Sequence, residues 1–191
     1  MASVRRFGLE SSETRASLLD AAEQLMCEEG YAAVTSRRIA SQAGLKPQLV
    51  HYYFRTMDDL FLATLRRRTE HNRERLTRAL ASSKPLRALW EMNTDPQGTA
   101  LIMEFSALAN HRKAIRAEIA RYAGQLRAMQ AEAFARLPAD DRVGTHAPVV
   151  WSMLMTSISR ILVMEQALGI SGGHAETLAL VERYLCEFES R

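Results

Sequence analysis

Residues that interrupt helices or cross-link chains are scarce in this 191-residue sequence, which has nine glycines, five prolines and two cysteines. Few glycines and prolines favour long helices over turn-rich β structure. Cys27 and Cys186 stand near opposite ends of the chain, so they form no disulfide framework, and we expect both to be buried in helices. The sequence has no CxxC, no HExxH and no Cys/His cluster. It therefore predicts no metal site and no cofactor.

Long apolar runs are missing as well. No segment approaches the roughly 20 apolar residues of a membrane-spanning helix. Arg5 and Arg6 are not followed by the apolar stretch of a secretory signal, so we expect a cytoplasmic protein with no membrane partner. The sequence also lacks a glycine-rich phosphate loop and a nucleophile elbow, and predicts no catalytic residue. A helical enzyme whose site is assembled from distant residues stays an alternative.

Acidic residues are absent from one stretch of the chain. The net charge is only +3, with a pI of about 9.1, but residues 30–57 contain four basic residues and no Asp or Glu. Residues 61–84 contain six arginines and Lys84 against Glu70 and Glu74. Such an uneven distribution is typical of a protein with a polyanionic partner. The arginine-rich stretch alone could equally be a solvated helix face.

The spacing of the apolar residues predicts helices along the whole chain and no strand. Thr35 and Thr56 are suited to cap helix starts, Pro47 suits a first helical position, and Gly30 and Gly44 suit helix ends with positive φ. A loop is predicted over 138–148. The expected helices are 12–29, 36–43, 47–53, about 57–81, a short one at 84–93, 98–137 with a possible break near Asn110, 148–169, and 174–189.

The second and third of these helices have the pattern of a helix-turn-helix. Ala40 is small where the two helices would cross, and Gly44 allows the left-handed turn between them. Leu45, Val50 and Phe54 are expected to point inward. The side chains expected to point outward from the third helix are Pro47, Gln48, His51 and Tyr52.

This stretch resembles the TetR (tetracycline-repressor) family of bacterial transcription regulators over about residues 12–66. Three positions depart from the family pattern: Lys46 replaces the usual Ser or Thr cap, His51 a common tyrosine, and Met57 a phosphate-contacting lysine. The rest of the chain resembles the family only in its helicity and length. The residues that carry the resemblance are Thr35, Ile39, Ala40, Ala43, Gly44, Leu45, Val50, Tyr53, Phe54, Asp58 and Leu60.

The resemblance implies an all-α fold in two parts. Residues 1–56 would form an N-terminal arm and a three-helix DNA-binding domain, and residues 57–191 a linking helix with a larger ligand-binding and dimerisation domain. A homodimer formed through the two C-terminal helices would bind a palindromic operator, most simply as a repressor released by a small, mainly apolar molecule. Control by a partner protein, without a small ligand, is the alternative.

The expected DNA contacts come from the second and third helices. Gln48 is suited to read adenine, Lys46 guanine or phosphate, and Pro47 a thymine methyl group. His51, Tyr52 and Tyr53 offer N–H and O–H groups to phosphates, although Tyr53 could equally belong to the core. Arg37 resembles the family position that reaches a base or phosphate. Phosphate contacts are also expected from Thr35 and Ser36, which could instead be helix caps only.

A ligand pocket is expected between the middle helices. Methionines suit pockets that accept varied apolar molecules, but each apolar candidate taken singly is more often ordinary core, since such residues are usually buried. The apolar candidates are Trp90, Met103, Phe105, Leu108, Tyr122, Met129, Phe134, Trp151 and Met155. The polar groups that would orient a ligand are Glu104, Asn110, His111 and Ser159, with His111 otherwise part of a solvated helix corner.

Overall fold

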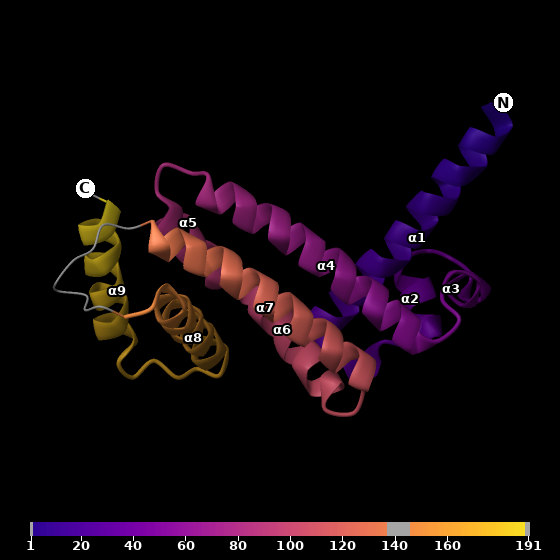
Figure 1. The fold of residues 1–191 in the computed structure, drawn as a ribbon. Helices are drawn as coiled ribbons and strands as arrows, with labels where there is room; N and C mark the ends of the chain where they lie inside the picture. The colour runs from indigo at the N-terminus through magenta and orange to yellow at the C-terminus, as the bar shows by residue number, and fades with distance from the viewer. Residues whose placement is uncertain (1, 137–145, 190–191) are drawn as a thin grey trace. The chain divides into compact units, whose positions relative to one another are not determined.

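The computed structural model describes residues 2–136 and 146–189, and every regular element in these ranges is helical, which confirms the all-α expectation (Figure 1). No helix in the described ranges is long and apolar enough to cross a membrane. Most of the predicted 138–148 loop lies outside them. The elements are α1 (Ala2–Glu29), the 3-10 helix η1 (Tyr31–Ala33), α2 (Ser36–Gln42), α3 (Pro47–Tyr53), α4 (Met57–Leu80), α5 (Pro85–Asn93), α6 (Pro96–Ala109), α7 (Lys113–Ala135), α8 (Pro148–Ala167) and α9 (His174–Glu189).

Most helix boundaries follow local rules that the sequence displays. The Thr35 hydroxyl accepts from the backbone N–H of Arg38 at 3.4 Å and caps α2. At α4, Thr56 and Asp59 cap each other reciprocally, with the Asp59 N–H donating to Thr56 Oγ1 at 3.1 Å and the Thr56 N–H to the Asp59 carboxylate at 3.0 Å. The predicted break in the long middle helix falls between α6 and α7. The predicted start of α1 at Ser12 is wrong, because the helix continues back to Ala2 without a proline to interrupt it.

The turn between α2 and α3 is a Schellman motif. Gly44 adopts φ +66°, its N–H donates to the Ser41 carbonyl at 3.2 Å, and the Leu45 N–H donates to the Ala40 carbonyl at 2.8 Å. These bonds satisfy carbonyls that the end of a helix leaves unpaired. Pro47 then opens α3, and the turn fixes how α3 leaves α2.

The chain divides into two compact units. The first comprises residues up to 69 together with 101–119, and the second comprises residues 70–100 and 120 onward. The division expected after residue 56 differs because Phe105, Leu108 and Ile115 from α6 and α7 supply buried side chains to the core of the first unit. Helices α4, α6 and α7 therefore each contribute residues to both units.

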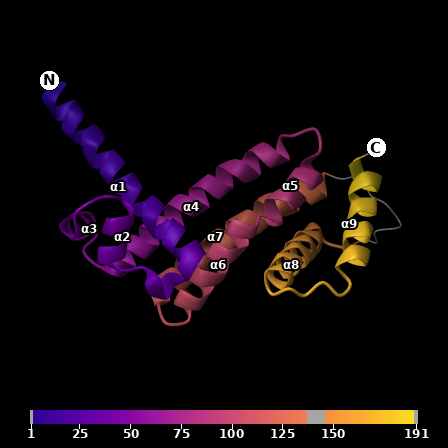
Figure 2. The ribbon, with the colours of Figure 1, turned by 180° about the vertical axis from the view of Figure 1, so that it is seen from behind.

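The core of the first unit joins α1, α2, α3 and the start of α4, which lie together in both views (Figures 1 and 2). Val50 is fully buried and Phe54 is 3% exposed, so α3 is anchored by one face, as predicted. The Arg15 guanidinium lies 5.3 Å from the centre of the Phe54 ring, a cation–π contact between α1 and the end of α3. The aliphatic core residues include Leu18, Leu19, Leu25, Met26, Ile39, Leu60 and Leu65.

In the second unit, polar contacts connect α5 to α9 and α7 to α8. The Glu189 carboxylate accepts from the backbone N–H of Arg87 at 2.8 Å, in the first turn of α5, where N–H groups have no helical partner. Gln130 accepts from Ser152 at 2.7 Å. The predicted burial of Cys186 is wrong: this residue of α9 is exposed, because it lies beside the Arg87–Glu182 ion pair at the surface. Cys27 is half-buried.

Candidate nucleic-acid interface and apolar cavity

The outer face of α3 carries the side chains that the sequence predicted. Gln48, His51 and Tyr52 are exposed, with Tyr52 77% accessible, and so are Lys46 and Pro47 at the start of the helix. Lys46 occupies the N-cap position of α3 but makes no side-chain capping bond, because a lysine lacks the hydroxyl of the usual Ser or Thr. The helix therefore buries Val50 and presents amide, imidazole and phenol groups outward.

Tyr53 packs partly against the core, one of the two environments that the sequence left open. Its side chain is half-buried against the core of the first unit. Its ring also meets the Tyr52 ring edge-to-face, with centroids 5.0 Å apart. Tyr53 thus supports the position of Tyr52, which is the more accessible of the two.

On α2, the two adjacent arginines have different surroundings. Arg38 pairs with Glu29 at the end of α1, and the hydrogen bond from Arg38 lowers the pKa of the Glu29 carboxyl. Arg37 is exposed. Thr35 is exposed and serves as the cap of α2, while Ser36 is half-buried. A cap whose hydroxyl oxygen accepts from the helix can still donate its proton to a phosphate oxygen.

Carboxylates near the helix-turn-helix are engaged by neighbouring groups. No acidic residue lies between Glu29 and Asp58 in the sequence. Glu29 pairs with Arg38, Asp58 pairs with Arg112, and Asp59 accepts from the Thr56 cap. Exposed positive charge on this stretch is carried by Arg37, Lys46 and Arg55. This arrangement suits a polyanion, since phosphates meet positive side chains while the nearby carboxylates are already paired.

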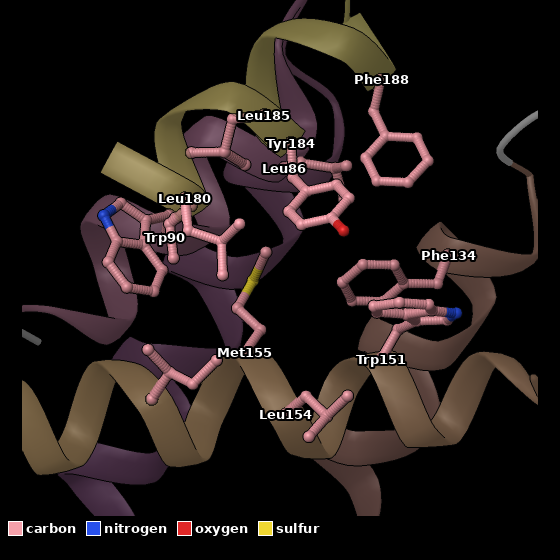
Figure 3. Close-up of a pocket in the computed structure, with 12 residues that line it drawn as sticks. Leu86, Trp90, Phe134, Trp151, Leu154, Met155, Leu180, Tyr184, Leu185 and Phe188 are labelled. Atoms are coloured by element: carbon pink, nitrogen blue, oxygen red, sulfur yellow. The ribbon is translucent and has the colours of Figure 1, made fainter. Parts of the chain in front are cut away.

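A separate apolar cavity of about 210 Å³ lies in the second unit, between α5, α7, α8 and α9 (Figure 3). Met155 extends from α8 into the space between Trp90 on one side and Phe134 and Trp151 on the other. The lining side chains are aliphatic, aromatic or thioether, so shape and dispersion would dominate binding. They are Leu86, Trp90, Phe134, Trp151, Leu154, Met155, Ile158, Leu180, Val181, Tyr184, Leu185 and Phe188.

Several of the sequence-predicted pocket residues are elsewhere. Trp90, Phe134, Trp151 and Met155 line the cavity. Phe105 and Leu108 do not, because they are buried in the hydrophobic core cluster of the first unit. Met103 and His111 are exposed in the first unit. Tyr122 is buried and Met129 half-buried on α7, and neither lines the cavity.

The polar candidates are not at the cavity either. Glu104 accepts from the Tyr31 backbone N–H in the first unit, and the Ser159 hydroxyl donates to a carbonyl of its own helix. Asn110 is exposed at the α6–α7 turn. The α9 contribution to the cavity was missed, although Val181, Leu185 and Phe188 recur at helical spacing and could have indicated a buried stripe.

A second apolar feature is a set of exposed large side chains on α8, α9 and the turn between them. Each is between 38% and 69% accessible. Contiguous exposed apolar groups on this scale are typical of interaction surfaces. The set comprises Val149, Val150, Met153, Leu154, Ile161, Leu168, Ile170, Leu178 and Leu180. Within the described residues, no group of three or more His, Cys, Asp or Glu side chains is placed to hold a metal ion.

Comparison with known proteins matches residues 18–64 to the family described as bacterial regulatory proteins, tetR family. The HTH-type transcriptional regulator BetI of Brucella canis is 30% identical over 188 residues, covering 90% of this chain and 89% of that protein. BetI of Rhizobium meliloti is 42% identical over 52 residues, and there the alignment covers 27% of this chain and only 26% of the relative.

Solved structures share the fold at lower sequence identity. A transcriptional regulator from Saccharomonospora viridis in complex with choline has a TM-score of 0.75 and 19% identity, covering 94% of this chain and 97% of that one. A TetR-family regulator from Rhodococcus sp. has a TM-score of 0.70 and 16% identity, covering 93% and 99%. The similarity therefore extends through both units and not only through the helix-turn-helix.

Proposed function

Because this chain belongs to the TetR family of bacterial regulatory proteins, which are transcriptional regulators and not enzymes, we propose that it is a ligand-responsive repressor that binds a palindromic operator as a homodimer. The observation that carries the proposal is the outer face of α3, with Gln48, His51 and Tyr52 exposed and the flanking carboxylates paired. A regulator of this kind acts on chromosomal DNA, in the cytoplasm.

The helix α3 would enter the major groove. Gln48 can donate to and accept from adenine with one amide, which makes it the side chain best suited to sequence readout. Lys46 would contact guanine or phosphate, and Pro47 a thymine methyl group. His51 and Tyr52 would bond to phosphates and so fix the register of the helix on the duplex. Arg37, Thr35 and Ser36 on α2, together with Tyr53, would complete the backbone contacts.

A dimer is needed because one helix-turn-helix reads only one half-site. Two copies related by a two-fold axis would read half-sites separated by about one helical turn or a multiple of it. The exposed apolar side chains on α8 and α9 support these helices as the pairing surface, since a second copy would remove them from water.

The effector would bind in the cavity among α5, α7, α8 and α9. Its aliphatic and aromatic lining favours a small, mainly apolar molecule. Choline is the first compound to test, because it is bound in one structural neighbour and because ring faces such as those of Trp90, Trp151 and Tyr184 attract quaternary ammonium groups. Binding would shift the dimer toward a state whose two α3 helices no longer match the half-sites.

Selection from a random duplex pool with the purified protein tests the DNA-binding proposal. We expect a two-fold symmetric sequence to be enriched, and Gln48→Ala to lose about 1–3 kcal/mol of discrimination at one position per half-site. Gln97→Ala, an exposed glutamine on α6 in the second unit, is the matched control. Failure to enrich any duplex at low salt would overturn the proposal.

A thermal-shift screen with choline and with neutral apolar compounds tests the effector. A ligand should raise the melting temperature and release the operator, and Trp90→Ala should weaken both effects. Met103→Ala, an exposed methionine outside the cavity, should change neither. If no compound in a broad screen binds, control by a partner protein replaces the small-molecule effector.

A further inference from the structure

The corner formed by the end of α6, the start of α7 and the turn between them contacts both ends of the helix-turn-helix. On one side, the Glu104 carboxylate of α6 accepts from the backbone N–H of Tyr31, just before α2, at 2.7 Å. On the other side, Arg112 in the turn forms an ion pair with Asp58, in the first turn of α4 just after α3. The α6–α7 corner thus contacts the chain just before α2 and just after α3, the two helices that would meet DNA.

The Glu104 carboxylate packs closely against Gly30 and Tyr31, in the segment that precedes α2. Gly30 adopts φ +82° and ψ 164°, a conformation almost confined to glycine. A Cβ atom at this position would lie 3.2 Å from Glu104 Oε2, so the missing side chain leaves space for the carboxylate. Tyr31 opens the 3-10 helix, where a backbone N–H has no helical partner, and the charge on Glu104 strengthens its bond.

The corner itself is fixed by bonds across its turn. Arg116 on α7 donates to the carbonyls of Ala109 and Asn110, at 3.1 and 3.0 Å, and so satisfies the carboxyl end of α6. The same part of α6 buries Phe105 and Leu108 in the core of the first unit. Glu104 and Arg112 therefore project from a packed and hydrogen-bonded support.

We infer that Glu104 and Arg112 are positioning residues for operator binding, and that the corner between α6 and α7 sets the orientation of α2 and α3. The inference rests on the proposed function as a DNA-binding regulator. Each of the two short helices has only seven residues, so the flanking segments at Gly30–Thr35 and Phe54–Met57 act on their orientation together with the buried faces.

The direction in which DNA affinity changes when Glu104 is substituted distinguishes a positioning role from a simple effect of its charge. Removing the negative charge of Glu104 would by itself tighten binding to any polyanion. Loss of positioning weakens binding to the operator and leaves binding to unrelated duplexes nearly unchanged, because the latter depends on charge and not on register. Glu104→Gln removes the charge but keeps an oxygen that can accept from Tyr31.

The experiment compares Glu104→Ala, Glu104→Gln and Arg112→Ala with a matched surface control, Glu132→Ala, an exposed glutamate on α7 in the second unit. Fluorescence anisotropy measures affinity for the selected operator and for an unrelated duplex of equal length. Hydrogen exchange reports protection of the Tyr31 amide, and thermal denaturation shows that each variant is folded at the assay temperature.

We expect Glu104→Ala to bind the operator about tenfold more weakly, the consequence of losing roughly 1.4 kcal/mol, with faster exchange at Tyr31. Arg112→Ala should also weaken operator binding, while Glu104→Gln and Glu132→Ala stay near the wild type. A folded Glu104→Ala with wild-type operator affinity, or equal losses on both duplexes, would overturn the inference. A wild-type protein that binds no duplex would instead overturn the proposed function, and the positioning role with it.

Discussion

Substituting Gly30 with alanine should destabilise the first unit far more than the same change at Gly44. Both glycines have positive φ, at +82° and +66°. A Cβ added at Gly44 meets no heavy atom within 4 Å, whereas one added at Gly30 lies 3.2 Å from the Glu104 carboxylate. Both substitutions therefore add backbone strain, and only the one at Gly30 also disturbs a part-buried contact.

The magnitudes follow from these geometries. At Gly44 the left-handed strain of roughly 1–2 kcal/mol is partly offset by the lower entropy of the unfolded chain, which leaves about 1 kcal/mol. At Gly30 the backbone lies in a region nearly restricted to glycine, and the new methyl group also disturbs the charge-assisted bond to Tyr31. A loss of roughly 2–5 kcal/mol is expected there.

Urea unfolding of the two alanine variants measures this difference, and a double-mutant cycle isolates its cause. In a Glu104→Ala background the carboxylate is already gone, so Gly30→Ala should lose only the strain component and become about 1–2 kcal/mol less damaging. If Gly30→Ala destabilises no more than Gly44→Ala, or if removing the Glu104 side chain brings no relief, the carboxylate does not occupy the space beside Gly30.

Three further predictions concern other parts of the chain. Phe54→Ala should lose about 3–5 kcal/mol of stability in urea unfolding because its ring is buried. Tyr52→Ala should change stability by less than about 0.5 kcal/mol and weaken operator binding, because its side chain is exposed. Equal losses of stability in the two variants would contradict the placement of α3. The hydrogen bond from Arg87 lowers the pKa of Glu182, so this carboxylate stabilises the fold above its unfolded pKa and the benefit disappears as pH falls through the folded value. Melting curves should show a deficit for Glu182→Gln at neutral pH that shrinks as pH falls below the ordinary glutamate pKa of about 4.3 and is lost below the folded pKa. A deficit independent of pH would refute the pairing. Leu178→Glu, at a side chain 47% exposed on α9, should yield monomers in sedimentation velocity and weaken operator binding, whereas an unchanged dimer would exclude that position from the interface.

The helix-turn-helix could be predicted because its boundaries depend on local chemistry. Thr35 supplies a hydroxyl where α2 begins, Gly44 supplies the positive φ of a Schellman turn, and Pro47 supplies a fixed φ where α3 begins. The exposure of Gln48 and burial of Val50 then follow from helical spacing alone. None of these inferences requires knowing where a distant segment lies.

The cavity could not be predicted in the same way. Helix α6 is apolar on more than one side, so periodicity does not reveal that Phe105 and Leu108 pack into the first unit while Met103 stays exposed. The aromatic residues of α9 have a helical spacing that fits either a dimer surface or a cavity wall. Choosing between these requires the packing of α9 against α5, which depends on long-range contacts such as Arg87 with Glu189.

The acidic residues around the helix-turn-helix have two physical consequences at once. Glu29, Asp58 and Glu104 each make a contact that fixes a segment next to α2 or α3. The ion pairs of the first two also compensate carboxylates that would otherwise repel phosphates. A polar but uncharged residue at these positions would remove the repulsion without supplying a strong contact. An unpaired carboxylate would repel phosphates and supply no contact either. Paired carboxylates at the edges, with Arg37 and Lys46 exposed, reconcile a rigid helix-turn-helix with a surface suited to DNA.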